Sequence, residues 1–435
     1  MSEVVCVASS EASGANSYRQ LSDVTKLEWG NTSITKKSYV DAGFTAISAA
    51  GPDGLLDHFE WSGDGVVLSA IGARCGRCFY VSGKWTAIKN TIVIQGDPSA
   101  VNHKFLYHYL NDARKWKISG SGQPFITLKT ARETSVPFPS LDAQNEIVAE
   151  LEKQFSRLDE AVANLQRVKA NLKRYKASVL KAAVEGRLVE TEATLARREG
   201  RAFETGEQLL QRTLEERRAK WSRRGKWKTP EPPTTDATLP DGWTWASVDQ
   251  LADVGTGATP KRDRAAYWDD GDVPWVTSSV VNGDYVDQAS EFVTKLALAE
   301  TNLTLYPIGT LLIAMYGEGK TRGKCTELRI PASTNQALAA LQVDSSIRGY
   351  LRHFLELNYE EMRKFASGGV QPNLNLGLVR AVCVPLPPLA EQARIVAEVD
   401  RHLTIRREVE ADVEANLKRA QALRQAALAK LFSYS

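Results

Sequence analysis

The sequence predicts an α+β protein made of two copies of one globular unit, each followed by a long helix. Three observations support this fold class: an internal duplication, strand-type segments in both copies, and a coiled-coil seam in the helices. The 435 residues are enough for two or three domains, each with its own core. We expect the two helices to pack as an antiparallel coiled coil that separates the globular units, giving a pseudo-two-fold arrangement.

Sequence motifs recur in the same order at a constant offset of 248 residues. Ser-Gly-x-x-Gln-Pro stands at 119–124 and 367–372, Val-Pro-x-Pro-x-Leu-x-x-Gln at 136–144 and 384–392, and Ile-Val-Ala-Glu at 147–150 and 395–398. Looser matches at slightly shorter offsets relate 65–72 to 309–317, and Lys89-Asn90 to Thr334-Asn335. An ordered series of this kind indicates a duplication.

Each copy begins with strand-type sequence and ends in an extended, proline-bounded segment. Short apolar runs at 65–71, 86–94, 310–315 and 336–343 are punctuated by Gly, Pro and Asn, which is typical of strands. The prolines at 137–139 and 385–388 favour extended backbone just before each helix. Asp142 and Glu391 then place acidic side chains in the first helical turn, where the helix dipole favours them.

Apolar residues recur every seven positions in the first helix, predicted over 142–186 and ended by Gly186. A helix of that length is roughly 65 Å long. The second helix is predicted over 390–432 with a less regular seam. The predicted seam residues are Leu151, Leu158, Leu165, Leu172 and Val179 in the first helix, and Val399, Val413 and Leu417 in the second. A core helix is the alternative for either one alone.

The composition sets limits on the class of protein. The net charge of +3 neither requires nor excludes nucleic acid, because binding depends on where basic residues cluster. No apolar run reaches the roughly 18 residues of a membrane span. The odd count of cysteines suits free thiols in a cytoplasmic protein; these are Cys6, Cys75, Cys78, Cys325 and Cys383.

Candidate catalytic motifs do not meet the requirements of their chemistry. The Gly-Lys-Thr at 319–321 resembles the end of a phosphate-binding loop, but Ala314 stands where the first glycine is needed. Cys75 and Cys78 have the spacing of zinc ligands without a second pair, so two free thiols are the simpler interpretation. Neither Pro-Pro pair fits the Asn/Asp-Pro-Pro-aromatic segment of an amino-methyltransferase. We therefore expect a non-catalytic protein without a metal or cofactor of its own.

Basic and polar residues occupy comparable loops in both copies. Lys and Arg neutralise phosphates, while Arg, Asn and Gln can form paired hydrogen bonds with base edges. The candidate DNA-binding residues are Arg74, Arg77, Lys84, Lys89, Asn90 and Gln123 in the first copy, and Thr259, Lys261, Arg262, Arg264, Lys320, Thr321, Arg322, Lys324, Asn335, Gln336 and Gln371 in the second. A solvated surface charge is the alternative for each one taken singly; the group on matching loops favours DNA.

Several motifs of the second copy carry a family resemblance. Leu-Pro-Asp-Gly-Trp-x-Trp at 239–245, Gly-Ala-Thr-Pro at 257–260, Pro-Trp-Val at 274–276 and Ser-Thr-Asn-Gln at 333–336 follow one another. Together with the helix ends at 181–188 and 424–432, they resemble the specificity (S) subunits of Type I restriction–modification systems over nearly the whole chain. The first copy departs from this pattern, since it lacks both the Gly-Trp-x-Trp entry and the Gly-x-Thr-Pro loop.

The resemblance implies a domain organisation. It places target-recognition domains at 1–140 and 241–388, and conserved coiled-coil helices at 141–187 and 389–435. The intervening 188–240 is then a charged helix, predicted over 192–221, followed by a Pro/Thr linker.

The resemblance also implies a function. Each recognition domain reads one half of a bipartite, asymmetric target in double-stranded DNA, and the helices set the gap. Two modification subunits, which carry S-adenosylmethionine, and two restriction subunits, which use ATP and Mg²⁺, are the implied partners. The alternatives are a stand-alone nuclease or methyltransferase, and a duplicated coiled-coil scaffold that binds proteins without reading DNA.

Overall fold

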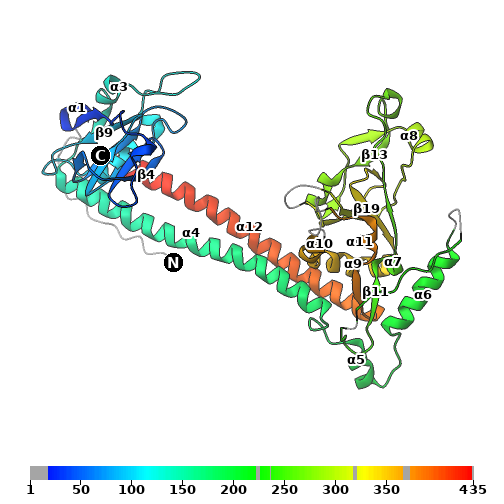
Figure 1. Ribbon diagram of the computed structural model, residues 1–435. Coiled ribbons are helices and arrows are strands. Elements are labelled where there is room, and N and C mark those ends of the chain that lie inside the picture. The colour runs from blue at the N-terminus through cyan, green and yellow to red at the C-terminus, as the bar shows by residue number, and fades with distance from the viewer. Residues whose placement is uncertain (1–17, 222–225, 236, 317–320, 366–372, 434–435) are drawn as a thin grey trace. The chain divides into compact units, whose positions relative to one another are not determined.

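The computed structural model describes residues 18–221, 226–235, 237–316, 321–365 and 373–433. The chain divides into two compact units (Figure 1). Unit 1 comprises Met1–Arg167 and Val413–Ser435, and unit 2 comprises Val168–Asp412. Each unit therefore contains one globular copy together with part of each long helix.

Unit 1 contains two four-stranded sheets, in the orders β2-β9-β6-β7 and β4-β3-β8-β5. The strands are β2 (Lys26–Trp29), β3 (Phe44–Ser48), β4 (Gly51–Leu56), β5 (Trp61–Ser62), β6 (Gly65–Ser69), β7 (Cys78–Val81), β8 (Lys84–Ala87) and β9 (Thr91–Gln95). The helix α2 (His103–Leu110) covers the first sheet, where its Phe105 and Leu106 share a core with Val66, Leu68 and Ile92. The two short strands β1 (Tyr18–Gln20) and β10 (Ser135–Pro137) pair antiparallel beside the short helices α1 (Leu21–Val24) and α3 (Leu128–Arg132).

Unit 2 contains a five-stranded sheet, β12-β19-β16-β17-β14, and a three-stranded sheet, β15-β13-β18. The strands are β12 (Ala252–Thr256), β13 (Val273–Val276), β14 (Tyr285–Val286), β15 (Glu291–Val293), β16 (Leu311–Ala314), β17 (Cys325–Leu328), β18 (Ser333–Thr334) and β19 (Leu338–Val343). Its helices include α7 (Val248–Leu251), α8 (Lys295–Glu300), α9 (Ser345–Leu357), α10 (Tyr359–Phe365) and α11 (Leu376–Arg380). The strands β11 (Thr244–Ser247) and β20 (Cys383–Leu386) form the antiparallel pair that corresponds to β1 and β10.

The duplication in sequence is a duplication in topology. β9 joins β2 and β6 in unit 1 as β19 joins β12 and β16 in unit 2, with antiparallel pairing throughout. The parallel pair β3–β8 corresponds to the parallel pair β13–β18. The recurrence of a parallel pair next to an antiparallel pair in both sheets supports a common origin of the two copies.

The long helices are α4 (Leu141–Val184, 44 residues) and α12 (Leu389–Ser433, 45 residues). In unit 1 the Arg424 guanidinium lies 2.8 Å from the Asp159 carboxylate, and in unit 2 the Tyr175 hydroxyl contacts His402. Partner numbers fall along α12 as they rise along α4, so the helices run antiparallel. Together with the mixed sheets and the duplicated units, this pairing confirms the predicted fold class.

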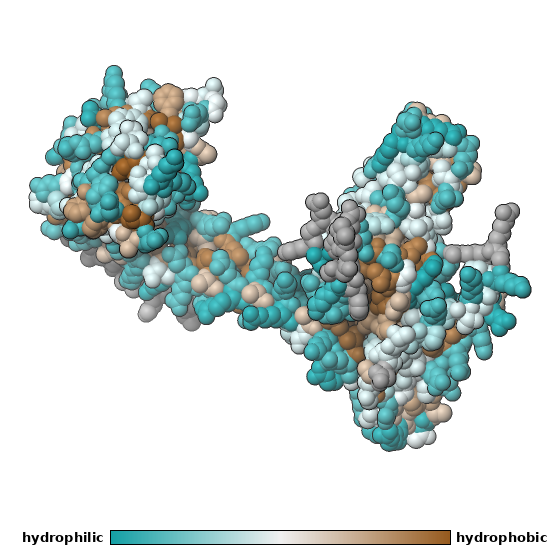
Figure 2. Space-filling model, viewed as in Figure 1, coloured by the Kyte–Doolittle hydropathy of each residue, from teal (hydrophilic) through white to brown (hydrophobic). Residues whose placement is uncertain are grey.

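Burial of the predicted seam residues varies along the two helices. Leu151, Val179, Val399 and Val413 are buried, whereas Leu158, Leu165, Leu172 and Leu417 are half-buried. Other apolar side chains of the two helices remain exposed: Val168, Ile405, Val409 and Leu423. The visible face of these helices accordingly mixes hydrophobic with hydrophilic colour (Figure 2).

A repeated glutamine ties each helix to its globular unit. Gln144 is fully buried; its side-chain amide donates to the Pro139 carbonyl at 3.0 Å and its oxygen accepts from the Asn102 backbone at 2.8 Å. Gln392, 248 positions later, is equally buried and donates to the Pro387 carbonyl at 2.9 Å. The glutamine of the repeated motif therefore satisfies a carbonyl where the strand turns into the helix.

Two predicted elements are interrupted in the structure. The charged helix expected over 192–221 is two helices, α5 (Glu192–Glu199) and α6 (Gly206–Ala219), because Gly200 ends the first in a left-handed conformation with φ of 66°. The strand expected over 86–94 is split between β8 and β9 by Asn90, whose φ is 68°. By contrast, Gly186 lies just past the end of α4 with φ of 67°, as the predicted C-terminal stop requires.

Among the described residues, no helix combines the length and apolar character needed to cross a bilayer. The same residues hold no group of three or more His, Cys, Asp or Glu side chains arranged to bind a metal ion.

Gly257 is predicted to be intolerant of a side chain. A Cβ atom there would lie 1.7 Å from the carbonyl oxygen of Thr334, so Gly257→Ala must push the loop that follows β12 away from β18. We expect a loss of roughly 1–3 kcal/mol in the free energy of unfolding, measured by urea denaturation. Gly122→Ala is the control, because a Cβ there meets nothing within 4 Å. Equal losses in the two variants would contradict the close approach.

Candidate nucleic-acid interface

Four loops of unit 2 meet where its strands begin or end together. Thr256 at the end of β12 pairs with Ala339 near the start of β19, and Ala314 at the end of β16 pairs with Leu338. The parallel strands β13 and β18 end on the same side, because the Asn335 backbone donates to the Val276 carbonyl at 3.0 Å. We call this set of loops edge 2; it comprises the described residues of 257–264, 277–282, 315–325 and 335–337.

Side chains from different loops contact one another at edge 2. The Thr259 hydroxyl donates to the Gln336 amide oxygen at 2.6 Å, and the Lys324 ammonium donates to the Asn282 amide oxygen at 2.9 Å. The Asn335 side chain accepts from the Ala337 backbone at 3.1 Å, which holds the 335–337 loop. Residues far apart in sequence thus form one polar surface built on backbone positions fixed by the sheets.

The loops of unit 1 that we call edge 1 comprise 30–35, 70–77, 88–90 and 119–125. The first three correspond to 257–264, 315–325 and 335–337 of edge 2, whereas 119–125 corresponds to 367–373 by the offset of 248. Here the Arg74 guanidinium donates to the Ala50 carbonyl at 2.5 Å, which ties the second loop to the turn between β3 and β4. The Gly72 backbone donates to the Pro124 carbonyl at 2.9 Å, bringing the 119–125 loop alongside. Lys89, Asn90 and Gln123 are exposed on these loops.

One turn of edge 1 is reproduced bond for bond at edge 2. The Ser69 backbone donates to the Arg77 carbonyl at 2.8 Å and Gly76 donates back to Ser69 at 2.9 Å. In unit 2, Ala314 donates to the Lys324 carbonyl at 3.1 Å and Gly323 donates back to Ala314 at 2.8 Å. Gly76 and Gly323 both have a positive φ, 88° and 84°, which residues with a side chain rarely adopt. Arg77 and Lys324 are therefore equivalent basic residues on equivalent turns.

The structure changes the counterpart of Lys89 in the second copy. It also adds Thr32, which the comparison of the two sequence copies missed. Asn31 donates to the Ala87 carbonyl at 2.8 Å as Ala258 donates to the Thr334 carbonyl at 3.0 Å. Ala87 therefore corresponds to Thr334. Lys89, two residues after Ala87, corresponds to Gln336, not to Thr334 as the sequence repeat indicated. By the same contact, Thr32 corresponds to Thr259. The Gly-x-Thr of the second copy thus has a counterpart at 30–32, although the first copy lacks the proline.

Three predicted basic residues either lie away from these edges or are held by acidic and aromatic side chains. Lys84 begins β8, whereas edge 1 lies at the other end of that strand, and its ammonium sits 4.6 Å from the centre of the Phe59 ring. Arg262 contacts the Glu291 carboxylate at 2.5 Å and stacks 3.9 Å from the Trp268 ring. Arg264 is ion-paired with Glu300 at 2.7 Å. These contacts fix the positions of Arg262 and Arg264 within the unit.

The remaining predicted residues are exposed, half-buried or outside the described residues. Lys261 is exposed at the start of the Trp268 turn, and its carbonyl accepts from the Trp268 ring nitrogen at 3.0 Å. Thr321 and Arg322 are half-buried in the turn that precedes β17. Lys320 and Gln371 lie outside the described residues, as does Cys6.

The cysteine pair in the edge 1 turn does not have the arrangement of a metal site. The Cys75 thiol donates to the Ala70 carbonyl at 3.3 Å, and the buried Cys78 thiol donates to the Leu110 carbonyl at 3.5 Å. Burial raises the pKa of the Cys78 thiol far above its usual range, which disfavours the thiolate that a metal requires. The two thiols are directed to different carbonyls and act as ordinary parts of the turn and the core.

Comparison with known proteins identifies one family whose model matches the chain. The family model of the Type I restriction modification DNA specificity domain matches the chain twice, at residues 16–173 and 240–419. Each match covers one globular copy and the greater part of the helix that follows it. The chain belongs to this family.

Curated relatives of this specificity family are distant in sequence. The chain is 24% identical over 427 residues to the EcoDI specificity subunit of Escherichia coli, covering 93% of this chain and 88% of that protein. It is 25% identical over 176 residues to the MjaIX specificity subunit of Methanocaldococcus jannaschii, covering 39% and 40%. The chain thus aligns with less than half the length of the MjaIX protein.

A solved structure supports the family assignment at the level of the fold. It concerns complex assembly and conformational transition of the type I R-M system, and its matching chain is 20% identical with a TM-score of 0.63. The alignment covers 96% of this chain and 98% of that one.

Arg262 is predicted to stabilise unit 2. Arg262→Ala removes the contact with Glu291 and the stacking on Trp268, and we expect a loss of about 1 kcal/mol in the free energy of unfolding. The neighbouring Lys261→Ala is the control, with an expected change within about 0.5 kcal/mol. Chemical denaturation measures both. If the two substitutions cost the same, the stacked ion pair is not stabilising.

Proposed function

We propose that the chain is the DNA-specificity subunit of a Type I restriction–modification complex, with edge 1 and edge 2 each reading one half of a bipartite, asymmetric target. The observation that carries the proposal is the pair of equivalent turns that present Arg77 and Lys324 within two matched copies of the family domain. Residues 1–140 and 241–388 are then the recognition domains. A Lys or Arg on a glycine-bounded turn suits contact with a phosphate or a guanine edge.

The subunit supplies recognition, and the chemistry belongs to its partners. S-adenosylmethionine, ATP and Mg²⁺ are bound by the modification and restriction subunits, two of each, in the cytoplasm of a bacterial or archaeal cell. The relatives are specificity subunits of Type I restriction enzymes, which supports this assignment.

The helices have two roles in the proposal. As two continuous helices of 44 and 45 residues, α4 and α12 fix the gap between the half-sites. Their exposed apolar side chains, Val168, Ile405, Val409 and Leu423, suit docking of the modification subunits. Two modest sites on one frame gain effective concentration, and contacts in both halves multiply specificity.

Arg77→Ala and Lys324→Ala are predicted to weaken DNA binding by roughly tenfold each. If each residue contacts a phosphate, the slope of log affinity against log salt becomes shallower by about 0.9. The measurement is fluorescence anisotropy with a duplex selected from a random library by the wild-type full chain, over a range of salt concentrations.

Lys84→Ala is the matched control for this experiment, because it removes the same charge from the opposite end of β8 in unit 1. Its affinity should equal that of the wild type. Equal losses from Lys84→Ala and Arg77→Ala would show that net charge alone matters and that edge 1 is not a specific contact surface. Failure of the wild type to select any sequence would favour the protein-binding scaffold.

Inserting four residues near Leu165 of α4 is predicted to lengthen the permitted gap or to abolish binding. Four helical residues add about 6 Å, close to two base pairs of DNA. The same insertion within 226–235, outside both long helices, is the control and should leave the gap unchanged. Selection from duplexes with variable gaps measures this. An unchanged gap in the α4 variant would contradict the role of the helices as a spacer.

A further inference from the structure

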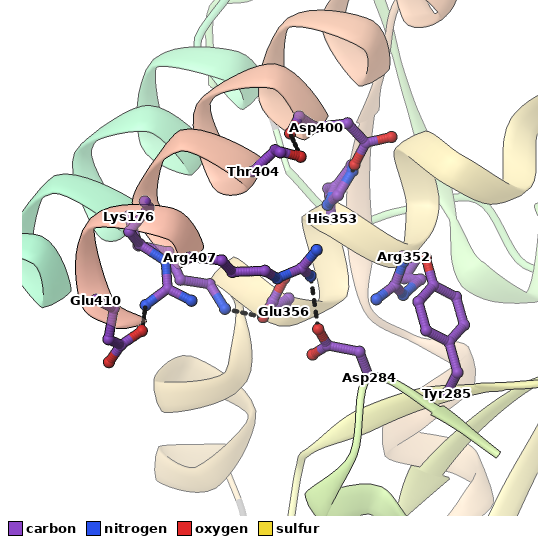
Figure 3. Close-up of polar contacts among 11 residues, drawn as sticks. Lys176, Asp284, Tyr285, Arg352, His353, Glu356, Asp400, Thr404, Arg407 and Glu410 are labelled. Atoms are coloured by element: carbon purple, nitrogen blue, oxygen red, sulfur yellow. Dashed lines mark hydrogen bonds and ion pairs between the residues drawn. The ribbon is translucent and has the colours of Figure 1, made fainter. Parts of the chain in front are cut away.

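A polar cavity of about 240 Å³ lies inside unit 2, where the long helices pass the globular part (Figure 3). Charged side chains from α4, α9, α12 and the turn before β14 line it. Most apolar helix contacts of unit 2 lie elsewhere, in the core around Ile395 and Val399. The cavity is therefore a place where charge pairs, not apolar packing, connect the helices to the globular part.

Two ion pairs and one hydrogen bond cross the cavity. The Arg407 guanidinium of α12 lies 2.7 Å from the Asp284 carboxylate of the turn before β14. Lys176 of α4 contacts Glu356 of α9, and His353 of α9 lies 3.1 Å from the Asp400 carboxylate of α12. The hydrogen bond from His353 keeps the pKa of Asp400 below its usual value, so this carboxylate stays charged at neutral pH. Two of these contacts join a long helix to α9, and the third joins α12 to the turn before β14.

The pair formed by Arg407 and Asp284 differs from the others because it reaches the turn behind edge 2. Asp284 follows Asn282 by two residues, and the Asn282 amide oxygen accepts from the Lys324 ammonium at 2.9 Å. The Asp284 carbonyl also accepts from the Glu327 backbone at 3.4 Å, at the start of the β14–β17 pairing. A continuous set of contacts thus leads from α12 to the basic turn of edge 2.

We propose that Arg407 and Asp284 are positioning residues for edge 2: their ion pair anchors the 277–286 turn on α12 and so holds Asn282 and Lys324 in place. In this role neither residue touches DNA. The consequence for DNA reading rests on the proposed function, whereas the anchoring of the turn does not. Edge 1 holds its own basic turn differently, through the bond from Arg74 to Ala50.

The expected size of the effect on amide exchange follows from the solvent exposure of the ion pair. The side chains of Arg407 and Asp284 are 52% and 48% exposed, so solvent weakens the ion pair and its loss loosens the turn without unfolding the unit. We expect backbone amides in 277–286 and 321–328 to exchange about two- to fivefold faster when either partner is removed.

Hydrogen–deuterium exchange on the full chain, without DNA, tests the anchor directly. Arg407→Gln and Asp284→Asn should both accelerate exchange in these two segments. Arg401→Gln is the matched control, because Arg401 is similarly exposed on α12 but pairs with Glu398 of the same helix. Unchanged exchange in Arg407→Gln and Asp284→Asn, or equal acceleration in Arg401→Gln, would overturn the proposal.

Binding of the selected duplex separates positioning from a direct charge effect. Asp284→Asn removes a negative charge, so simple electrostatics predicts tighter DNA binding. A positioning role predicts a different result. Both variants should distinguish the selected bases from other bases several-fold less well at one half-site, and as well as the wild type at the other. Weaker binding by Arg407→Gln with tighter binding by Asp284→Asn would make Arg407 a direct phosphate contact and overturn the positioning role. A wild-type chain that selects no duplex would contradict the proposed function, and amide exchange would still decide whether the anchor exists.

Discussion

Burial of the helix ends in the two globular cores is the constraint on which the rest of the structure depends. A pair of helices has no third element to cover its seam, which is why Leu158, Leu165 and Leu172 stay half-buried. The end of α4 is instead fixed by Leu180 and Ala183 in the core of unit 2. In unit 1, Phe432 near the end of α12 lies 5.4 Å from the Phe105 ring and 5.3 Å from the Tyr109 ring. Each unit therefore requires a segment of both helices to complete its packing.

Edge 1 and edge 2 also depend on packing within each unit, since strand pairing determines where each loop begins. Gly257 lies too close to the Thr334 carbonyl for any side chain, and Gly76 and Gly323 take the left-handed backbone that their turns require. The backbone is thus held by the sheets, while Arg77, Lys324 and Gln336 project from it. Such an arrangement lets two copies share a framework and differ in the side chains that face a ligand.

The sequence predicted the features that have local signals. The heptad pattern and Gly186 placed α4 within two residues of its observed ends, and the repeated prolines placed the extended entry to each helix. The family was equally accessible, because its motifs lie in order in the second copy. The short break at Gly200 was missed because the charged sequence on both sides is helical in character.

Contacts between distant residues could not be derived in the same way. The contact of Arg262 with Glu291, 29 residues away, is one example. Whether Lys84 lies on edge 1 depends on which end of β8 leads into that edge, and only the strand pairing shows this. Thr32 was missed because it lies 227 residues before Thr259, so a search at the constant offset of 248 passes over it. A search that allowed gaps around the Gly-x-Thr pattern could have found it.

The most direct test of the account is to co-express the chain with its modification subunit and map methylated bases across a genome by single-molecule sequencing. The account predicts one asymmetric motif of two short specified halves separated by an unspecified gap of fixed length. A stable complex that methylates no such motif, or a motif with only one specified half, would contradict the claim that the two edges read DNA together.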